Sequence, residues 1–505
     1  MSGIYDDSNR QVMPRWYLFK TACQLGDLKP ETIREKPKLE LPTSFNQKGK
    51  DWREKRTILH ALELVGTALI GGDFLNSDAN EAAAFILDSE EPPTSLGRQI
   101  AEVYKNDRNI DNTYSIELPA DNLRHRYEIA HLKKLLRRDP RNAIAWADLA
   151  FHYTLLGQKK RAEDCMDNAV SLGRDNRFIL RSAARYFLHM GKPDKSLFHL
   201  RRSPLSKVDP WLASAEIAIS ERIGNKARLM KPAQAMISDR DLSPWSINEL
   251  AATLSTVEAR HGSASKSKKL LSKALQQPNE NTLAQAEWLA STLGQEVIRP
   301  QINVLAMYEA DTRRSFRDGD YGQALERAKE WFQFQPFTTE PAIMASYIAA
   351  VCLQNDHEAI AIIEKAKATS LENFYLNNNH AFSLASLGRL TESEKVITCI
   401  DESTLTERER NTFAATKGLI EFRRGNASEG RDLYKKAIAG FKNIKQYRLA
   451  AIATFFWARE ENLIHSSFEN DALKAAKGLA DKYDVKELQK YAEFLAGKKP
   501  FQSDR

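Results

Sequence analysis

The sequence has few of the residues that mark tight turns or covalent crosslinks. Its 505 residues include only 22 glycines and 18 prolines, too few for the frequent turns of a many-stranded sandwich. The four cysteines, Cys23, Cys165, Cys352 and Cys399, lie far apart, so no CxxC pair and no zinc-finger spacing occurs. We therefore expect a helical protein with reduced, structural thiols.

Long apolar runs are missing as well. No uncharged apolar run approaches the ~18 residues that a membrane-spanning helix requires. The N-terminal segment MSGIYDDSNRQVMPRWYLFK contains two aspartates and lacks the apolar core of a secretory signal. We expect a cytoplasmic protein without a membrane-embedded segment.

The motifs that carry chemistry are also missing. The sequence has no HExxH, no GxxxxGK[ST], no GxSxG and no GxGxxG after a predicted strand. His125 and His131 lie on a basic segment without a carboxylate or thiolate that would complete a metal site. The sequence therefore predicts a protein that is not an enzyme, with no catalytic residue, no cofactor and no metal.

The composition is that of a folded helical chain. Hydrophobic residues make up 42% and charged residues 28% of the sequence, which is enough apolar material to form a core and excludes disorder of the whole chain. The net charge of +7 is small for this length. It permits an acidic partner without indicating one.

Short glycine-centred turns recur along the chain, each between an apolar periodic stretch and an alanine-rich one. Gly157 and Gly191 are 34 residues apart, and Gly388 and Gly425 are 37 apart. Self-similarity at this period predicts a stacked array of helix pairs. The turns lie in YTLLGQKKRAEDCMDNAV, YFLHMGKPDKSLFHLRRS, EARHGSASKSKKLLSKAL, SFRDGDYGQALERAKEWF, SLASLGRLTESEKVITCI and EFRRGNASEGRDLYKKAI.

One of these turns, DGDYGQALERA from Asp318 to Ala328, contains acidic residues and glycines that could bind a cation or a phosphate. Because the turn recurs elsewhere without those residues, an architectural role explains it better. We interpret Gly319 as the turn glycine between two helices and Asp320 as the cap of the second helix. Ala324 and Ala328 then form the contact face of the pair.

The clearest repeat, residues 143–176, resembles the tetratricopeptide repeat. It carries the W-x2-L-[GA]-x2-Y pattern at Trp146, Leu149, Ala150 and Tyr153, followed by the small residues Gly157, Ala162 and Ala169. Corresponding positions are Tyr308, Gly319, Tyr321, Ala324, Ala328 and Pro336 in a second unit, and Ala381, Leu384, Gly388, Ser393 and Ile397 in a third. The resemblance implies an all-α fold, a right-handed α-solenoid of stacked antiparallel helix pairs.

The predicted organisation has five parts. They are an extended N-terminal arm at 1–55, divergent helical repeats at 56–142, the repeat array at 143–445, a C-terminal helix pair with a capping helix at 446–497, and a polar tail at 498–505.

Prolines at positions 14, 30, 37 and 42 prevent a continuous helix in the arm. Its aromatic residues Trp16, Tyr17 and Phe19 can serve as an anchor on a partner protein. The alternative is an arm that folds back on the first repeats.

The resemblance also implies which side chains face a partner. In this family, set positions of the first helix in each pair project into a concave groove that holds a peptide or helix. The corresponding residues here are Phe178, Arg181, Arg185, His189, Glu309, Arg313, Phe316, Arg317, Tyr375, Asn378, Asn379 and Phe382.

Two arginine pairs among them have their members four residues apart on one helix face. Arg181 with Arg185, and Arg313 with Arg317, can each converge on a carboxylate or phosphate; the alternative is an exposed, solvated pair. Asn378 and Asn379 resemble the amides with which some family members hold a peptide backbone or a terminal carboxylate. The full carboxylate clamp of the family, with lysine and asparagine in consecutive units, is missing.

A second basic feature is the segment RHRYEIAHLKKLLRRDPR, residues 124–141. On a helix it would place its leucines inward and spread its cations over the outer side, as in a phosphate-contacting surface. It lacks the interleaved aromatic residues that stack on bases, and a solvated face is the alternative. Its candidate nucleic-acid contacts are Lys133, Lys134, Arg137 and Arg138.

The predicted function is that of a scaffold or adaptor that binds a protein partner by shape and groove chemistry. The alternative is a regulatory or substrate-targeting subunit of a nucleic-acid enzyme, for example a nuclease, which would use the basic helix. A catalytic N-terminal region is a third interpretation, but no motif supports it. The sequence does not specify which protein is bound, because this fold hosts many functions.

Overall fold

The computed structural model describes residues 10–26, 45–71, 77–89, 95–106, 122–293, 304–367, 373–489 and 491–497. Throughout these ranges the regular secondary structure is helical and includes no strand. The prediction of an all-α protein is confirmed. Much of the predicted arm, at 1–9 and 27–44, and the predicted tail at 498–505 lie outside the described residues.

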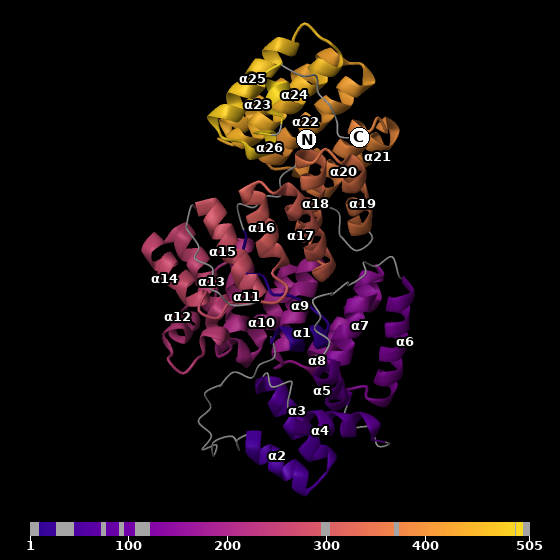
Figure 1. The fold of residues 1–505 in the computed structure, drawn as a ribbon, viewed down its shortest axis with the longest axis vertical. Helices are drawn as coiled ribbons and strands as arrows, with labels where there is room; N and C mark the ends of the chain where they lie inside the picture. Colours follow the sequence, from indigo (N-terminus) through magenta and orange to yellow (C-terminus); the bar gives the residue numbers. More distant parts are fainter. Residues whose placement is uncertain are drawn as a thin grey trace. The chain divides into compact units, whose positions relative to one another are not determined.

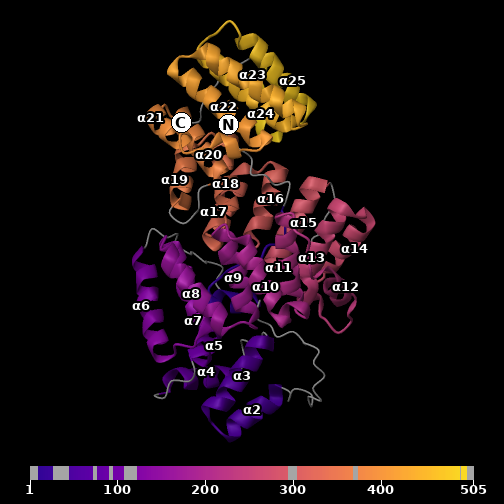
Figure 2. The same cartoon turned by 180° about the vertical axis from the view of Figure 1, so that it is seen from behind.

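The chain divides into two compact units. Unit 1 comprises Met1–Arg10 and Met307–Arg505, and unit 2 comprises Gln11–Ala306. In both units the helices pack mainly against their neighbours in the chain, as antiparallel pairs would (Figures 1 and 2).

Unit 2 contains the N-terminal helices and the repeat at residues 143–176 (Figure 1). Its helices are α1 (Phe19–Leu25), α2 (Phe45–Glu54), α3 (Ile58–Gly71), α4 (Ser77–Asp88), α5 (Ser95–Asn106), α6 (Asn122–Arg138), α7 (Ala143–Leu155), α8 (Lys159–Leu172), α9 (Arg177–His189), α10 (Pro193–Arg202), the 3₁₀ turn η3 (Pro204–Lys207), α11 (Pro210–Arg222), α12 (Met230–Ser238), α13 (Pro244–His261), α14 (Ala264–Ala274) and α15 (Glu280–Leu293).

Unit 1 continues the pattern of neighbouring helix pairs (Figure 2). Its helices are α16 (Tyr308–Asp318), α17 (Tyr321–Phe334), α18 (Glu340–Tyr347) with the π-helical turn η4 (Ile348–Cys352), α19 (Asp356–Lys367), α20 (Phe374–Ser386), α21 (Leu390–Ile397), the 3₁₀ turn η5 (Glu402–Thr404), α22 (Glu407–Arg424), α23 (Ala427–Asn443), α24 (Tyr447–Leu463), α25 (Glu469–Lys482), α26 (Lys486–Gln489) and α27 (Ala492–Leu495).

Polar side chains at the helix starts explain where many of these helices begin. The first N–H groups of a helix lack acceptors inside it, and a short oxygen-bearing side chain can supply one. Asn142 accepts from the backbone N–H of Ala145 at 2.9 Å and caps α7. Asn176 and Asp209 cap α9 and α11 in the same way, and Thr406 forms a capping box at α22.

The turn between α16 and α17 has the geometry expected for a structural connection between two packed helices. Gly319 ends α16 in the left-handed conformation, with φ of +86°, which costs little only in glycine. The Asp320 side chain accepts from the backbone N–H of Gln323 at 3.1 Å. Ala324 and Ala328 are fully buried. The interpretation of this stretch as a turn between two packed helices is confirmed.

Small residues also lie at the contact between α7 and α8. Ala162 is fully buried, so a larger side chain at this position would push the two helices apart. We expect Ala162→Leu to lower the free energy of unfolding by about 1–3 kcal/mol, as overpacking does. The matched control, Ala130→Leu on the exposed side of α6, should change it by less than about 0.5 kcal/mol. Denaturant unfolding of both variants measures the difference, and equal effects would contradict the helix contact.

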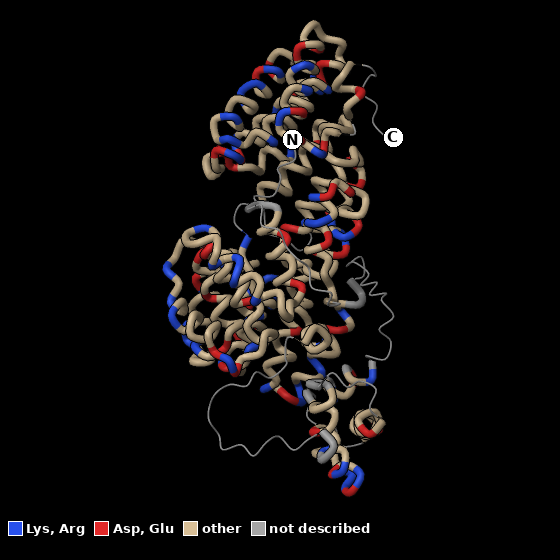
Figure 3. The backbone as a smooth tube through the Cα atoms, turned by 60° about the vertical axis from the view of Figure 1, so that its left-hand side comes forward, with Lys and Arg blue, Asp and Glu red and all other residues tan. Residues whose placement is uncertain are grey.

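The described residues also bear on the expectations about thiols and membrane-spanning segments. Cys23, Cys165, Cys352 and Cys399 are free thiols. In the ranges given above, none of the helices combines the length and apolarity needed to cross a bilayer. Figure 3 shows Lys and Arg interspersed with Asp and Glu along the helices of each unit.

Candidate functional site

A non-helical stretch of the N-terminal region is buried in unit 2. We call residues 11–26 the docked segment; residues 11–18 have no regular secondary structure, and α1 follows. Val12 is fully buried, and Trp16 and Tyr17 are each 3% exposed. Buried irregular backbone is unusual, because its N–H and C=O groups need partners that a helix would supply internally. The surrounding helices must supply those partners.

The docked segment lies against α7, α9, α11, α13 and α15, and each of these except α15 is followed by a described helix that packs on it. We call the surface formed by α7, α9, α11, α13 and α15 the first-helix face. Trp16 meets Phe151 of α7 and Tyr186 of α9 edge-on, with ring centroids 5.3 and 5.6 Å away. Phe19 meets Phe178 of α9 in the same way at 5.4 Å. Such edge-to-face contacts stabilise aromatic pairs beyond their buried area.

Aliphatic contacts extend the site toward α11 and α13. Met13 belongs to an apolar cluster that includes Leu180 of α9 and Leu212 of α11. Val12 belongs to a second cluster that includes Ala251 of α13. The docked segment therefore forms part of the core of unit 2.

Two polar side chains of the first-helix face bind the backbone of the docked segment. The Asn281 amide of α15 donates to the Met13 carbonyl at 2.9 Å. The Phe19 N–H donates to the Asp148 carboxyl of α7 at 3.0 Å. Neither bond depends on the side chain that the segment carries at that position, so both could hold another polypeptide.

Glu280 of α15 contacts side chains of the docked segment instead. The Tyr17 hydroxyl donates to Glu280 Oε1 at 2.7 Å, and the Arg15 Nε lies 3.9 Å from the same oxygen. Burial raises the pKa of Glu280, while Arg15 and the Tyr17 hydrogen bond partly offset that rise. This contact therefore favours a basic residue and, two positions later, a phenol in the bound segment.

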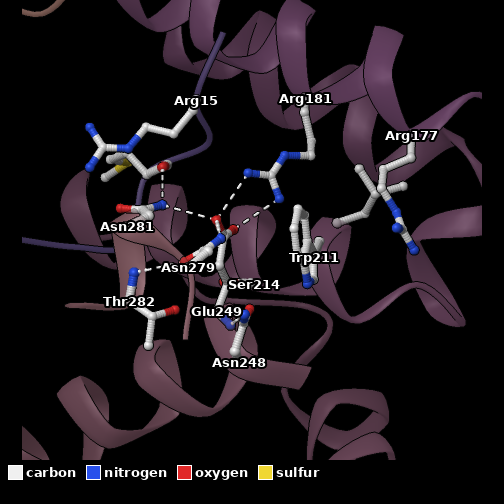
Figure 4. A network of polar contacts seen from close by, with 12 residues as sticks. Arg15, Arg177, Arg181, Trp211, Ser214, Asn248, Glu249, Asn279, Asn281 and Thr282 are labelled. Atoms are coloured by element: carbon white, nitrogen blue, oxygen red, sulfur yellow. Dashed lines mark hydrogen bonds and ion pairs between the residues drawn. The ribbon is translucent and has the colours of Figure 1, made fainter. Parts of the chain in front are cut away.

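A network of buried polar side chains supports these contacts (Figure 4). The Arg181 guanidinium donates hydrogen bonds from both terminal nitrogens to the Glu249 carboxylate of α13, at 2.9 and 3.0 Å, and lies 4.4 Å from the centre of the Trp211 ring. Asn281 and Asn279 donate to Glu249 Oε1 at 3.2 and 2.9 Å. Because Asn281 also donates to Met13, the network fixes the amide that holds the docked segment.

Asp148 lies in an environment that disfavours its charge. Burial raises its pKa to about 7, the hydrogen bond from Phe19 opposes the rise, and the nearby Glu128 adds to it. A carboxyl whose pKa is raised by folding stabilises the fold most below its ordinary pKa, and loses that contribution as the pH rises to the folded value.

We therefore expect the stability of Asp148→Asn relative to wild type to increase between pH 4 and pH 7. The amide stays neutral and keeps an oxygen that can accept from Phe19, so the gain should reach up to about 4 kcal/mol by pH 8. Urea unfolding of both proteins at pH 4.5, 6 and 8 measures it. A stability difference that does not change with pH would show that Asp148 ionises as freely in the folded protein as in the unfolded chain.

Two of the four groove residues predicted on α9, Phe178 and Arg181, lie at this site. Phe178 packs on Phe19 of the docked segment, and Arg181 is 4% exposed and bound to Glu249. Arg185 and His189 are half-buried on the same helix. The arginine pair was expected to bind a carboxylate of a ligand. For Arg181, that carboxylate is Glu249 of this chain.

The predicted residues of α16 are in unit 1, and two of them form a buried ion cluster. Glu309 accepts from Arg313 Nε at 3.0 Å and from Arg10 at 2.7 and 3.0 Å. Glu309 is 5% and Arg313 8% exposed. Phe316 and Arg317 are half-buried. Again the partner of an expected ligand-binding arginine is a carboxylate of this chain.

The predicted residues of α20 are also in unit 1 and are buried by neighbouring helices. Asn379 donates to the Ser346 hydroxyl of α18 at 3.0 Å, and Phe382 meets Phe456 of α24 edge-on at 5.0 Å. Asn378, Asn379 and Phe382 have no exposed surface, and Tyr375 is buried. Neighbouring helices of unit 1 therefore cover the side chains that were expected to face a partner.

The predicted basic surface on α6 is solvent-facing. Lys133, Lys134, Arg137 and Arg138 are exposed, while Leu132 and Leu136 are buried and Leu135 half-buried. His125 of the same helix lies against His152 of α7, with 3.0 Å between their Nδ1 atoms. Among the described residues, no group of three or more potential metal ligands comes together.

Sequence reasoning missed the residues that hold the docked segment. Asp148, Glu249, Glu280 and Asn281 belong to no recognised motif and lie on helices whose apolar pattern indicates only burial. A usable signal is the acidic residue within an otherwise apolar first helix, as in AWADLAF and INELAAT, because a buried charge requires a partner.

Comparison with protein-family models and with curated proteins found no match for this sequence.

Proposed function

We propose that this protein is a non-enzymatic scaffold or adaptor of the tetratricopeptide type, a right-handed solenoid that binds a protein partner along its first-helix faces. The observation that carries the proposal is the docked segment. A stretch of irregular polypeptide that leads into α1 lies against α7, α9, α13 and α15, held through its backbone by Asn281 and Asp148. The side chains already present on this face can therefore bind the backbone of a peptide.

The pairing of the helices and the turn chemistry also support the proposal. A short turn and a second helix that packs on the first follow α7, α9, α13, α16 and α22. The turn glycines Gly157 and Gly319 have positive φ. Stacked pairs of this kind present a continuous surface from their first helices. An extended ligand that crosses several helices can make many weak contacts, which suits an adaptor.

Affinity purification of the intact chain from its own cells tests the proposal. We expect a protein to co-purify in stoichiometric amounts, to survive nuclease treatment, and to bind the purified chain at the same ratio. The variant Lys133→Glu with Lys134→Glu, which alters only exposed residues of α6, should retain it. Recovery of the chain without any stoichiometric protein, under conditions that preserve its fold, would contradict the scaffold proposal.

A second candidate function is nucleic-acid targeting by α6, and the exposure of its cations supports it. Cations that neutralise phosphates release counterions, so affinity should fall steeply with salt. A filter-binding titration at 50 and 200 mM salt with single-stranded and duplex DNA and RNA tests this function. It requires salt-sensitive binding that the Lys133→Glu with Lys134→Glu variant loses; salt-insensitive binding, or binding that the variant keeps, would exclude it.

A further inference from the structure

We propose that the docked segment occupies the surface on which a partner binds. The first-helix face of unit 2 would take, in exchange for residues 11–19, a segment of a partner protein with the pattern Arg-Trp-Tyr-x-Phe. This inference rests on the proposed function and names the chemistry of the partner segment. The segment is basic and aromatic, and the surface that receives it is acidic and aromatic.

The place of the docked segment in the chain makes it separable from the helices that bind it. It precedes α2, so α2 to α15 remain one continuous chain when the segment leaves. Residues 27–44 join it to α2. The Tyr17 hydroxyl, the Phe19 N–H and the Met13 carbonyl form long-range hydrogen bonds with α7 and α15. The segment therefore behaves in the structure as a tethered ligand rather than as a member of a helix pair.

The side chains of the surface define the pattern that an occupant must have. Glu280 receives a basic residue and a phenol, since it faces Arg15 and accepts from Tyr17. The rings of Phe151 and Tyr186 receive Trp16. The ring of Phe178 receives the aromatic residue three positions later, Phe19.

The backbone contacts make the surface tolerant of other residues in between. Asn281 binds a carbonyl and Asp148 binds an N–H, groups that an extended segment of almost any sequence supplies. Departure of the docked segment would leave the Asp148 and Glu280 carboxylates and the aromatic rings of the face without these contacts. The groups that stabilise a bound segment therefore destabilise the empty surface. Binding consequently proceeds by exchange of one segment for another.

The tether sets the strength that a competing segment needs. Because the docked segment belongs to the same chain as the surface, it competes intramolecularly, and an outside segment must overcome its effective concentration. A free segment of equal intrinsic affinity therefore binds the intact chain weakly, and binds well when the chain's own segment is weakened.

The test uses the full-length chain with Trp16→Ala and Phe19→Ala, which weakens the tethered segment without altering the surface. The probe is a labelled peptide of residues 10–26 with serine in place of Cys23, and the readout is fluorescence anisotropy. We expect 1:1 binding to the variant at least tenfold tighter than to the wild-type chain. A further change, Asn281→Ala in the variant, should weaken the peptide at least fivefold, and a peptide carrying Trp16→Ala and Phe19→Ala should not bind.

A folded variant that binds the peptide no better than wild type overturns the proposal. Equally tight binding of the variant to an intact wild-type chain would assign the surface to a second copy of this protein and overturn the assignment to a different partner. Peptide binding with no co-purifying protein would leave the exchange intact and refute the scaffold function. A co-purifying protein that the peptide does not displace would support the scaffold function and refute the exchange.

Hydrogen exchange of the wild-type protein provides a second test that needs no variant. The amides of residues 12–19 should exchange through a partial opening, at least tenfold faster than the core amides of α9 and α13. Exchange of these amides at the same rate as those of α9 and α13 would show that the segment leaves only when unit 2 unfolds, and would overturn the proposal.

Discussion

Replacing Glu249 with alanine should lower the free energy of unfolding by about 3–5 kcal/mol, because it leaves a buried guanidinium without its counter-charge. Arg181 is 4% exposed and donates two hydrogen bonds to this carboxylate. The amides of Asn279 and Asn281 lose the same acceptor. Urea unfolding followed by tryptophan fluorescence measures the loss, since Trp211 lies beside Arg181.

A double variant separates the cost of an unpaired charge from the value of the ion pair. Arg181→Met with Glu249→Leu removes both charges and keeps apolar volume, so it should be more stable than Glu249→Ala by at least about 2 kcal/mol. If the double variant is as unstable as the sum of its two single changes, the two residues do not interact in solution and the network of Figure 4 is not formed.

Charge reversal at Arg313 should destabilise unit 1 by at least about 3 kcal/mol. The sequence places Arg313 and Arg317 on a partner-facing surface, where reversal would spare the fold. The structure instead buries Arg313 against Glu309, which also binds Arg10. A glutamate at 313 would bring a second carboxylate to this site and remove one of the cations that hold the first. Trp331, whose ring centre lies 5.8 Å from the Arg313 guanidinium, reports on the unfolding.

Arg317→Glu is the matched control for this prediction. Arg317 lies one turn further along α16 with 36% of its side chain exposed, and it pairs with the exposed Asp318 at 3.7 Å. Its reversal should change stability by less than about 1 kcal/mol. Equal effects of the two reversals would mean that the Glu309 cluster contributes nothing to unit 1.

The local architecture could be predicted from the sequence because its causes are local. Gly319 marks a turn since only glycine readily adopts positive φ, and Asp320 caps the next helix three residues from its hydrogen-bond donor. Ala324 and Ala328 recur at helical spacing on the side where two helices approach. Each of these inferences spans a few residues, which is the range over which helix chemistry acts.

The occupancy of the first-helix face could not be predicted, because its contacts join distant parts of the chain. Tyr17 and Glu280 are 263 residues apart, and Phe19 and Asp148 are 129 apart. No periodicity links such pairs. Trp16, Tyr17 and Phe19 indicate an anchor, and both of its interpretations, a partner and the repeats themselves, remained open in the sequence. The structure shows the segment folded back.

The burial of the predicted groove residues has the same origin. Helical spacing identifies which side of α9 or α16 points away from its pair, but not whether another part of the chain covers that side. Arg181 and Arg313 were expected to meet a carboxylate of a ligand, and each meets a carboxylate of this chain. The chemistry was recognised from the residue type, and its partner depends on the tertiary fold.

The claim that unit 2 binds partner proteins on its first-helix face is tested most directly by photo-crosslinking in cells. A photoreactive phenylalanine analogue is placed at Phe151 of α7 in the chain with Trp16→Ala and Phe19→Ala, and separately at Lys134 of α6 in the same chain. The proposal predicts that position 151, which faces the docked segment, crosslinks to a second protein, and that the exposed position 134 does not. Crosslinks to a protein or to nucleic acid from position 134 alone, with none from position 151, would contradict it.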